Sequence, residues 1–268
     1  MINLLNSVEK AINENRELPF SVYSSAQEQN LLNVPVVKPL LVIVLNGDKE
    51  IGRGKKEVCH SGDFLFLSDS SAIDIRNIPK DQKYLALLIE FEHHDFAGLH
   101  SSAPNNQHYC VGRVTPVLEQ CLQQFVESSL WAPERLWSLR KKEIIELLCH
   151  MGHKEILSMV GNSKVGHRLN DMYCEQNFHE LTIEHICDQL AMSESTLRRK
   201  LKSEGTSVQE IKDQARLGLG LHLLQTSGKS IGLIAEKCGY QSQSRFADRF
   251  KGRFGLTPSE LRKTKMAG

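Results

Sequence analysis

An internal repeat near the carboxyl end is the feature that most restricts how this chain folds. Six positions of one copy match positions 48 residues later, and two further apolar positions match at an offset of 49, so the second copy has one more residue beyond its turn. Each copy has apolar residues at helical spacing, a short break and a second helical stripe, which predicts two helices joined by a tight turn. The paired positions are Ile183, Ile186, Cys187, Leu190, Ala191 and Met192 with Ile231, Ile234, Ala235, Cys238, Gly239 and Tyr240, then Leu197 and Leu201 with Phe246 and Phe250.

The second helix of each copy carries basic and polar residues around its apolar anchors. We predict that Ser193 and Ser242 cap these helices and that the anchors face the core. In helix-turn-helix proteins the second helix enters the major groove, where Arg reads guanine and Gln reads adenine, while Lys and Ser suit phosphates. The predicted DNA-contacting residues are Ser195, Arg198, Arg199 and Lys202 in the first copy and Gln243, Ser244, Arg245, Arg249 and Lys251 in the second, with Arg253 also turned to solvent or DNA.

The segment between the copies, residues 208–225, has the apolar spacing of one long helix. A rigid connector would fix the separation of the two reading heads, which must address major grooves ~34 Å apart on one face of DNA. A single helix-turn-helix pattern also fits any three-helix bundle, whereas two in tandem with basic second helices favour DNA binding. The apolar stripe of the connector is Ile211, Ala215, Leu219, Leu223 and Leu224.

Charge is distributed unevenly along the chain. The total is 33 Lys and Arg against 32 Asp and Glu, net +1, which excludes a histone-like, polybasic-tail or acidic disordered protein. Residues 1–167 hold 17 basic and 20 acidic side chains, net −3, and residues 168–268 hold 16 and 12, net +4. Residues 193–265 alone hold 15 and 7, net +8. A basic last quarter indicates a nucleic-acid-binding module, with a solvated charged face as the alternative.

The region from Val165 to Arg262 resembles the DNA-binding domain of AraC/XylS-type transcription regulators. The most diagnostic match is the end of the second unit, where Gly255 is expected to stop a helix and Thr257 to cap the next one ahead of Pro258. The matching segments are Leu181-Thr182-Ile183 with Ala191-Met192-Ser193, Ser230-Ile231 through Ala235 with Gly239-Tyr240, and Phe250-Lys251-Gly252-Arg253-Phe254-Gly255-Leu256-Thr257-Pro258-Ser259.

This resemblance implies a bacterial, cytoplasmic transcription regulator, an activator in many cases, that binds double-stranded DNA as a homodimer and contacts RNA polymerase. It places base-facing positions at Ser195, Arg198 and Arg199 in the first head and at Gln243, Ser244 and Arg245 in the second. One position departs from the family pattern: Asp248 stands where the family often has Arg. We expect Asp248 to pair with Arg245 or Arg249, or to accept a hydrogen bond from a cytosine.

The amino-terminal half has the pattern of short strands. A helix is expected over residues 3–14, and apolar runs broken by Gly, Asp, Ser and Pro extend from residue 35 to 91. An Asn46-Gly47-Asp48 turn between two runs predicts a hairpin, and the spacing indicates an antiparallel sandwich or small barrel. The family resemblance implies a cupin-like barrel that senses a small-molecule effector, dimerises, or both. Candidate pocket residues are Tyr84, Phe64, Phe66 and Ile75.

The predicted fold class is α+β with two domains: a cupin-like antiparallel β-barrel with helices, then an all-α tandem helix-turn-helix domain. The first domain spans residues 1–160, including a helical segment over 114–157 with apolar stripes at 117–125 and 136–148. A linker rich in small residues is expected at 161–167, and the DNA-binding domain at 168–268.

The sequence contains few patterns that indicate catalysis or metal binding. Cupin enzymes use a His-x-His pair, but His60 follows Cys59, and His93 and His94 would point to opposite faces of a strand. A helical cluster of Cys149, His150 and His153 is the remaining metal candidate, against plain helix-end packing. No nucleophile elbow, P-loop or paired catalytic carboxylates are recognisable. We therefore expect no enzyme activity and no cofactor or metal.

Three functions are compatible with these observations. The first is a DNA-binding regulator controlled by an effector or by dimerisation. The second is a redox- or alkylation-responsive DNA-binding protein, which needs an exposed cysteine of low pKa such as Cys59 or Cys110. The third is a module whose basic face docks to an acidic protein. No run of about 18 apolar residues and no signal peptide is present, so a cytoplasmic location without membrane contact is expected.

Overall fold

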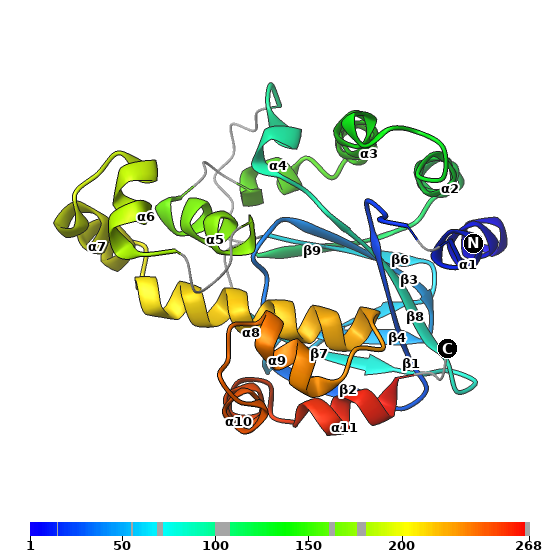
Figure 1. Ribbon diagram of the computed structural model, residues 1–268. Coiled ribbons are helices and arrows are strands. Elements are labelled where there is room, and N and C mark those ends of the chain that lie inside the picture. Colours follow the sequence, from blue (N-terminus) through cyan, green and yellow to red (C-terminus); the bar gives the residue numbers. More distant parts are fainter. Residues whose placement is uncertain are drawn as a thin grey trace.

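The structure, a computed structural model, is described for residues 1–14, 16–54, 56–68, 72–99, 108–160, 164–175 and 181–265. Two antiparallel sheets form the middle of the molecule, with helices on both sides (Figure 1). The first has five strands in the order β1 (Ser21–Ser25), β8 (Tyr84–Glu90), β3 (Leu40–Asn46), β6 (Asp63–Leu67) and β9 (Tyr109–Arg113). The second has four in the order β2 (Gln29–Pro35), β7 (Ala72–Ile78), β4 (Asp48–Ile51) and β5 (Glu57–His60).

These two sheets confirm the predicted antiparallel sandwich, and among the described residues no strand pairing closes them into one barrel. The hairpin predicted at Asn46-Gly47-Asp48 is wrong. Strand β3 pairs with β6 and β8, whereas β4 pairs with β5 and β7, so the chain passes from one sheet to the other at this turn. Gly47 has a φ of +82°, and a Cβ there would lie 2.5 Å from the carbonyl oxygen of Ile78, so only glycine fits the crossing.

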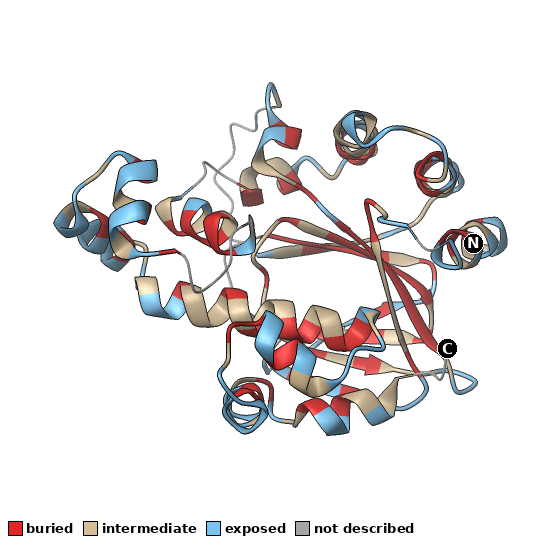
Figure 2. Ribbon diagram, in the orientation of Figure 1, coloured by how far each residue is buried: buried red, intermediate tan, exposed pale blue. Residues whose placement is uncertain are grey.

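The five-stranded sheet separates two hydrophobic clusters. Alternate residues of β6 show this: Phe64 and Phe66 belong to the cluster beneath the amino-terminal helices, while Leu65 and Leu67 belong to the cluster between the sheets. Phe64 and Phe66 are therefore core residues facing helices, and the prediction that they line a pocket with Ile75 is wrong. Figure 2 shows the buried residues on the sides of the helices that face the sheets.

Four helices cover the outer face of the five-stranded sheet: α1 (Ile2–Ile12), α2 (Pro116–Ser128), α3 (Trp137–His150) and α4 (Glu155–Val160). The predicted helices near residues 3–14, 117–125 and 136–148 are thereby confirmed. Two short 3-10 turns, η1 (His93–Phe96) and η2 (Glu134–Leu136), lie between these elements. His93 and His94 are thus not on an extended strand, and the His93 ring stacks on His167 with centroids 5.1 Å apart.

The last hundred residues are helical. Residues 161–163 of the predicted linker lie outside the described residues, and residues 165–167 form the first turn of α5. None of the described helices is both long and apolar enough to span a membrane. The helices are α5 (Val165–Glu175), α6 (Ile183–Leu190), α7 (Glu194–Ser203), α8 (Val208–Thr226), α9 (Ile231–Lys237), α10 (Gln243–Phe254) and α11 (Pro258–Thr264).

Candidate nucleic-acid interface

The two repeats form two helix-turn-helix units, α6–α7 and α9–α10. The Ser193 hydroxyl accepts a hydrogen bond from the backbone N–H of Thr196, and the Ser242 hydroxyl accepts one from Arg245, which confirms both predicted N-caps. At corresponding positions of the turns, Ala191 and Gly239 adopt left-handed backbone conformations with φ of 51° and 74°. Each turn therefore reverses the chain in the same way and sets the second helix across the first.

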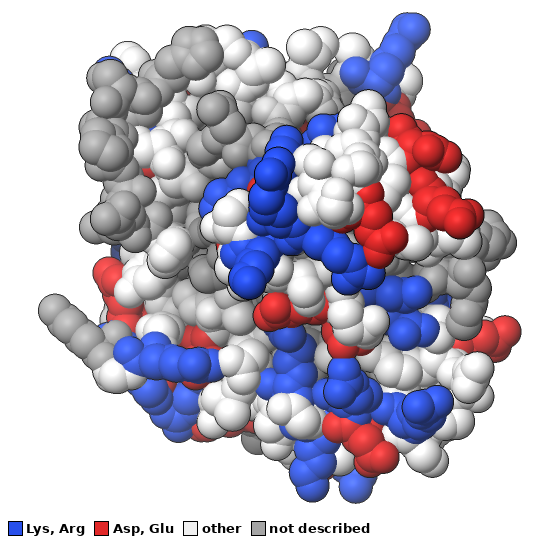
Figure 3. All heavy atoms as spheres, turned by 90° about the vertical axis from the view of Figure 1, so that its left-hand side faces the viewer, with Lys and Arg blue, Asp and Glu red and all other residues white. Residues whose placement is uncertain are grey.

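The second helix of each unit buries its predicted anchors and exposes its predicted contact residues. Leu197, Leu201, Phe246 and Phe250 have 0% exposure. Lys and Arg side chains gather in two groups on the side of the molecule where α7 and α10 lie (Figure 3). All nine residues predicted to contact DNA are exposed: Ser195, Arg198, Arg199, Lys202, Gln243, Ser244, Arg245, Arg249 and Lys251.

In the first unit, two of the four predicted contact residues are engaged within the helix. The Arg198 Nη2 lies 2.6 Å from a carboxylate oxygen of Glu194, one turn earlier. The Ser195 hydroxyl lies 3.0 Å from that of the capping Ser193. Arg199 and Lys202 form no ion pair with any described residue, so these two cations are available to a nucleic acid.

In the second unit, the side chains of Arg249, Asp248 and Arg253 have other surroundings than the sequence predicts. Arg249 is paired with Asp213 of α8, at 2.6 Å between Nη2 and Oδ2, instead of with Asp248. Asp248 is exposed and forms no ion pair in the described part of the chain. Arg253 does not face solvent or DNA: it is half-buried, and its Nε donates a hydrogen bond to the Asn33 carbonyl oxygen of β2, 3.1 Å away.

Two residues of α8 that the sequence did not single out support the second unit. Asp213 holds Arg249, as described, and Arg216 binds the turn between α9 and α10. The Arg216 Nε donates to the Cys238 carbonyl oxygen at 2.8 Å, and its Nη2 donates to that of Gly239. Its guanidinium also lies 4.7 Å from the centre of the Tyr240 ring. In the sequence, Arg216 stands out only as a basic residue within the predicted connecting helix, and no local pattern identifies the turn between α9 and α10 as its partner.

The second unit also packs directly against the strands. Phe246, Phe250 and Phe254 lie in the same hydrophobic cluster as residues of both sheets. Polar contacts add to it: Gln225 Nε2 donates to Gln29 Oε1 at 3.0 Å, and Gln29 Nε2 donates to the Thr264 hydroxyl at 2.8 Å. The DNA-binding region is therefore attached to the amino-terminal sheets through its second head.

A cavity of about 250 Å³ lies at this junction. Apolar residues of the strands, including the predicted Ile75, form most of its lining, and α8 closes it with Ala215, Gly218, Leu219, Leu221 and His222. Lys49 also lines it and is 4% exposed. Its ammonium donates to Asn77 Oδ1 at 2.7 Å and to the hydroxyl of Tyr84 at 3.4 Å. Tyr84, a predicted pocket residue, therefore does not line the cavity itself but contacts Lys49, which does.

Burial shifts the pKa values of Lys49, in this cavity, and of two cysteines elsewhere in the amino-terminal half. It lowers the pKa of Lys49 to about 8, because the charged ammonium is removed from water. Burial also raises the pKa of Cys59 to about 12 and that of Cys110 to about 12. Both thiols are buried. Neither cysteine has the exposed, low-pKa thiol that a redox- or alkylation-responsive protein requires.

Comparisons with known proteins agree with the local geometry. A helix-turn-helix domain model matches residues 186–264. The HTH-type transcriptional regulator GadX of Escherichia coli O6:H1 is 28% identical over 220 residues, which cover 77% of this chain and 78% of that protein. The HTH-type transcriptional regulator YdeO of Escherichia coli K12 is 40% identical over 85 residues, 32% of this chain and 33% of that protein.

Solved structures share the whole fold. A variant of ToxT from Vibrio cholerae strain SCE256, in its apo form, aligns with a TM-score of 0.69 at 14% identity, over 94% of this chain and 99% of that chain. Wild-type ToxT with a bound unsaturated fatty acid aligns with a TM-score of 0.67 at 14% identity, over 94% and 98%. The two exposed basic helices, the matched DNA-binding domain and the named relatives agree on one conclusion. This chain carries a helix-turn-helix domain of the AraC type and is similar to DNA-binding transcriptional regulators of that type.

Proposed function

We propose that α7 and α10 are the reading helices of this regulator and that their nine exposed residues make the contacts to DNA. The observation that supports this is the agreement of two independent copies. In each, the apolar anchors are fully buried and every predicted contact residue is exposed. Arg199 is the strongest candidate for base reading, because it lies on the exposed side of α7 without an ion pair among the described residues.

Two substitutions in α7 test this assignment against an operator selected from genomic fragments by the purified protein. Arg199→Ala is expected to weaken binding by about 1–3 kcal/mol and to relax the preference at one base pair. Lys202→Ala is expected to weaken all sequences equally and to reduce the salt dependence by about one counterion. Lys56→Ala, on the exposed surface of the sheet domain, is the matched control. Unchanged affinity and preference in Arg199→Ala would exclude α7 as a reading helix.

We also propose that a small amphipathic acid controls this regulator from the cavity at the domain junction. The lining is mostly apolar, and among the described residues the buried Lys49 ammonium has no carboxylate partner. A carboxylate with an apolar tail fits such a site, and the structural neighbour ToxT is known with an unsaturated fatty acid bound. Because both the strands and α8 line the cavity, an occupant would bind unequally to different arrangements of the two domains.

Calorimetric titration with an unsaturated fatty acid tests this proposal. The wild-type chain is expected to bind one molecule and to change its DNA affinity when loaded. Lys49→Met is expected to weaken the binding about tenfold or more, because a charge-assisted hydrogen bond is lost. Lys56→Met, which removes an exposed ammonium elsewhere, should bind as the wild type does. Equal binding by Lys49→Met would refute the role of this cavity.

Dimerisation through the helical segment 114–157 is a further part of the proposal. Large apolar side chains remain exposed there: Val117 at 61%, Trp131 at 70% and Leu139 at 65%. Sedimentation of the wild type at increasing concentration should show a dimer, and Val117→Glu with Leu139→Glu should yield a monomer. A wild-type chain that sediments as a monomer would refute this part. Contact with RNA polymerase stays a prediction from the family resemblance.

A further inference from the structure

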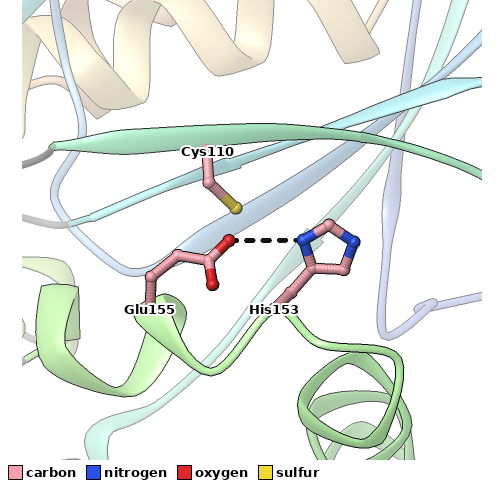
Figure 4. Close-up of side chains that lie close together, drawn as sticks. All are labelled: Cys110, His153 and Glu155. Atoms are coloured by element: carbon pink, nitrogen blue, oxygen red, sulfur yellow. Dashed lines mark hydrogen bonds and ion pairs between the residues drawn. The ribbon is translucent and has the colours of Figure 1, made fainter.

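A cysteine, a histidine and a glutamate that DNA recognition does not use converge at the outer face of the five-stranded sheet. Cys110 belongs to β9, His153 to the loop before α4, and Glu155 to the first turn of α4. Their side chains point toward one another (Figure 4), and their Sγ, ring nitrogen and carboxylate oxygen atoms all lie within 4.8 Å of one another. His153 Nδ1 is 3.3 Å from Glu155 Oε1.

The surrounding fold holds the His153 ring in place. Gly152, with a φ of +105°, turns the chain just after α3, and the His153 N–H donates to the Leu148 carbonyl oxygen at 3.0 Å. The ring packs edge-on against Phe64, with centroids 4.9 Å apart. Gly112 lies next to both rings: an added Cβ there would be 2.5 Å from Phe64 Cζ and 2.8 Å from His153 Cε1. The absence of a side chain at this strand position makes room for the imidazole beside Cys110.

We propose that Cys110, His153 and Glu155 bind a transition-metal ion of the Zn²⁺ class. Thiolate, imidazole and carboxylate are the three ligand types that Zn²⁺ takes, and three protein ligands leave a fourth position for water or another molecule. A thiolate also favours Zn²⁺ over Mg²⁺ and Ca²⁺, which prefer oxygen ligands. In a tetrahedral site the ligand atoms are roughly 3.5 Å apart, so small side-chain rotations complete the coordination.

The three residues differ in their exposure to solvent. Cys110 is 8% exposed and lies among the apolar residues under the helices. The side chains of His153 and Glu155 are 24% and 33% exposed, which gives an ion a path from solvent to the thiol. The ion would take the place of the thiol proton and would join β9 to α4. It would thereby fix the last helix of the amino-terminal domain to the sheet.

This grouping differs from the metal candidate that the sequence analysis weighed against helix-end packing. Cys149 is buried on α3 and His150 is exposed, and in the described residues neither belongs to a converging group of three. Only His153 of that predicted trio takes part. Its partners come from a strand about forty residues earlier and from the next helix, an arrangement that helical spacing does not predict.

The full-length protein, treated with EDTA and then freed of it, tests the proposal. Zn²⁺ titration in competition with a chromogenic chelator is expected to show one tight site per chain. Co²⁺ in its place should give the near-ultraviolet charge-transfer band of a thiolate ligand. Cys110→Ser and His153→Gln are each expected to weaken Zn²⁺ binding about 100-fold or more, and Cys110→Ser to abolish the Co²⁺ band.

Cys187→Ser is the matched control, because it removes a half-buried thiol of α6 and should leave both signals unchanged. If circular dichroism shows that Cys110→Ser does not fold, Glu155→Gln replaces it in the test, because this position is partly exposed. Glu155→Gln should weaken Zn²⁺ binding, while the Co²⁺ band of the thiolate should persist. Three results would overturn the proposal: no Zn²⁺ binding by the wild type, equal binding by His153→Gln, or a Co²⁺ complex without a thiolate band. In the first case the cluster is an ordinary hydrogen-bonded group in the core.

Discussion

The two helix-turn-helix units have the same local pattern but pack against different surroundings. The buried cluster of the first head is made of residues from α5 to α8 and the segment just before α6. The three phenylalanines of the second head share a cluster with Leu31, Val42 and other residues of both sheets. In Figure 1, α6 and α7 extend away from the sheets, whereas α10 lies beside β2 and packs with α9 and α11. The comparison teaches that two units of the same local geometry can differ in packing: in the described residues the second shares its core with the sheets, and the first has a core of its own.

This difference bears on how the proposed effector would act on the two heads. The cavity wall includes α8, the helix that connects both heads. A change there acts on the second head through the cluster that it shares with the strands, and on the first head through α8 and through Cys174 of α5. If an acid occupies the cavity as proposed, we expect the second head to be the more responsive, because its phenylalanines share a cluster with strand residues that line the cavity.

The largest effect is expected from the buried anchors. Phe250→Ala should destabilise the protein by about 3–5 kcal/mol, because it leaves a cavity in the cluster shared with the sheets, and Leu201→Ala by about 2–5 kcal/mol. Hydrogen–deuterium exchange, resolved for individual peptides by mass spectrometry, measures where each variant is destabilised. Phe250→Ala should increase exchange in α9–α11 and also in β2, whereas Leu201→Ala should increase it in α5–α7 and the start of α8 but not in the strands. If both variants increased exchange in the strands to the same extent, the two heads would not differ in how they pack against the sheets.

The ionisation of Lys49 gives a second effect on the shared cluster. Its pKa is lowered from 10.5 to about 8 by burial, so the folded chain holds fewer protons than the unfolded chain between these values. Unfolding then takes up a proton, and stability should rise with pH across this window by at most about 1.4 kcal/mol per pH unit. Denaturation at pH 8 to 10 measures the slope. Lys49→Met should lose this slope relative to the wild type, and Lys56→Met should keep it.

The parts of this fold that the sequence predicts are those set by local rules. The Ser193 and Ser242 caps, the stop at Gly255 and the start at Thr257-Pro258 all follow from the residues at the helix ends. Helical spacing likewise distinguishes anchors from exposed side chains, which is why all nine predicted contact residues are on the surface.

Contacts between distant segments were not predictable in this way. Gln225 meets Gln29 across 196 positions, and Arg253 meets Asn33 across 220, and no periodic pattern links such pairs. The Asn46-Gly47 turn was misassigned because the same glycine conformation serves a hairpin and a crossing between sheets. Arg253 was misplaced for a related reason: its position on the helix is compatible with solvent until β2 packs against it.

Arg253 provides a smaller test of the attachment of the second head. Arg253→Met keeps the apolar stem but removes the hydrogen bond to the Asn33 carbonyl oxygen, which should cost about 1–2 kcal/mol. Arg245→Met, an exposed arginine of the same helix, should change stability by less than about 0.5 kcal/mol while weakening DNA binding. Thermal denaturation and DNA affinity together check both. A larger stability loss in Arg245→Met would contradict the placement of these two side chains.

The smallest effect on stability is expected at the ion pair between Arg249 and Asp213, because exposed pairs contribute about 0–1 kcal/mol. Asp213→Asn should therefore leave folding nearly unchanged but release Arg249 toward DNA, and the affinity for the operator should rise. Asp248→Asn is the matched control, since it removes the same charge from the exposed side of α10 without breaking a pair. Affinities measured at two salt concentrations separate general charge from the release of Arg249. If both variants gain equally, removal of negative charge alone explains the gain, and Arg249 is not restrained by α8. If only Asp213→Asn gains, the connector helix limits an arginine of the second head in a way that has no counterpart at Arg199 in the first.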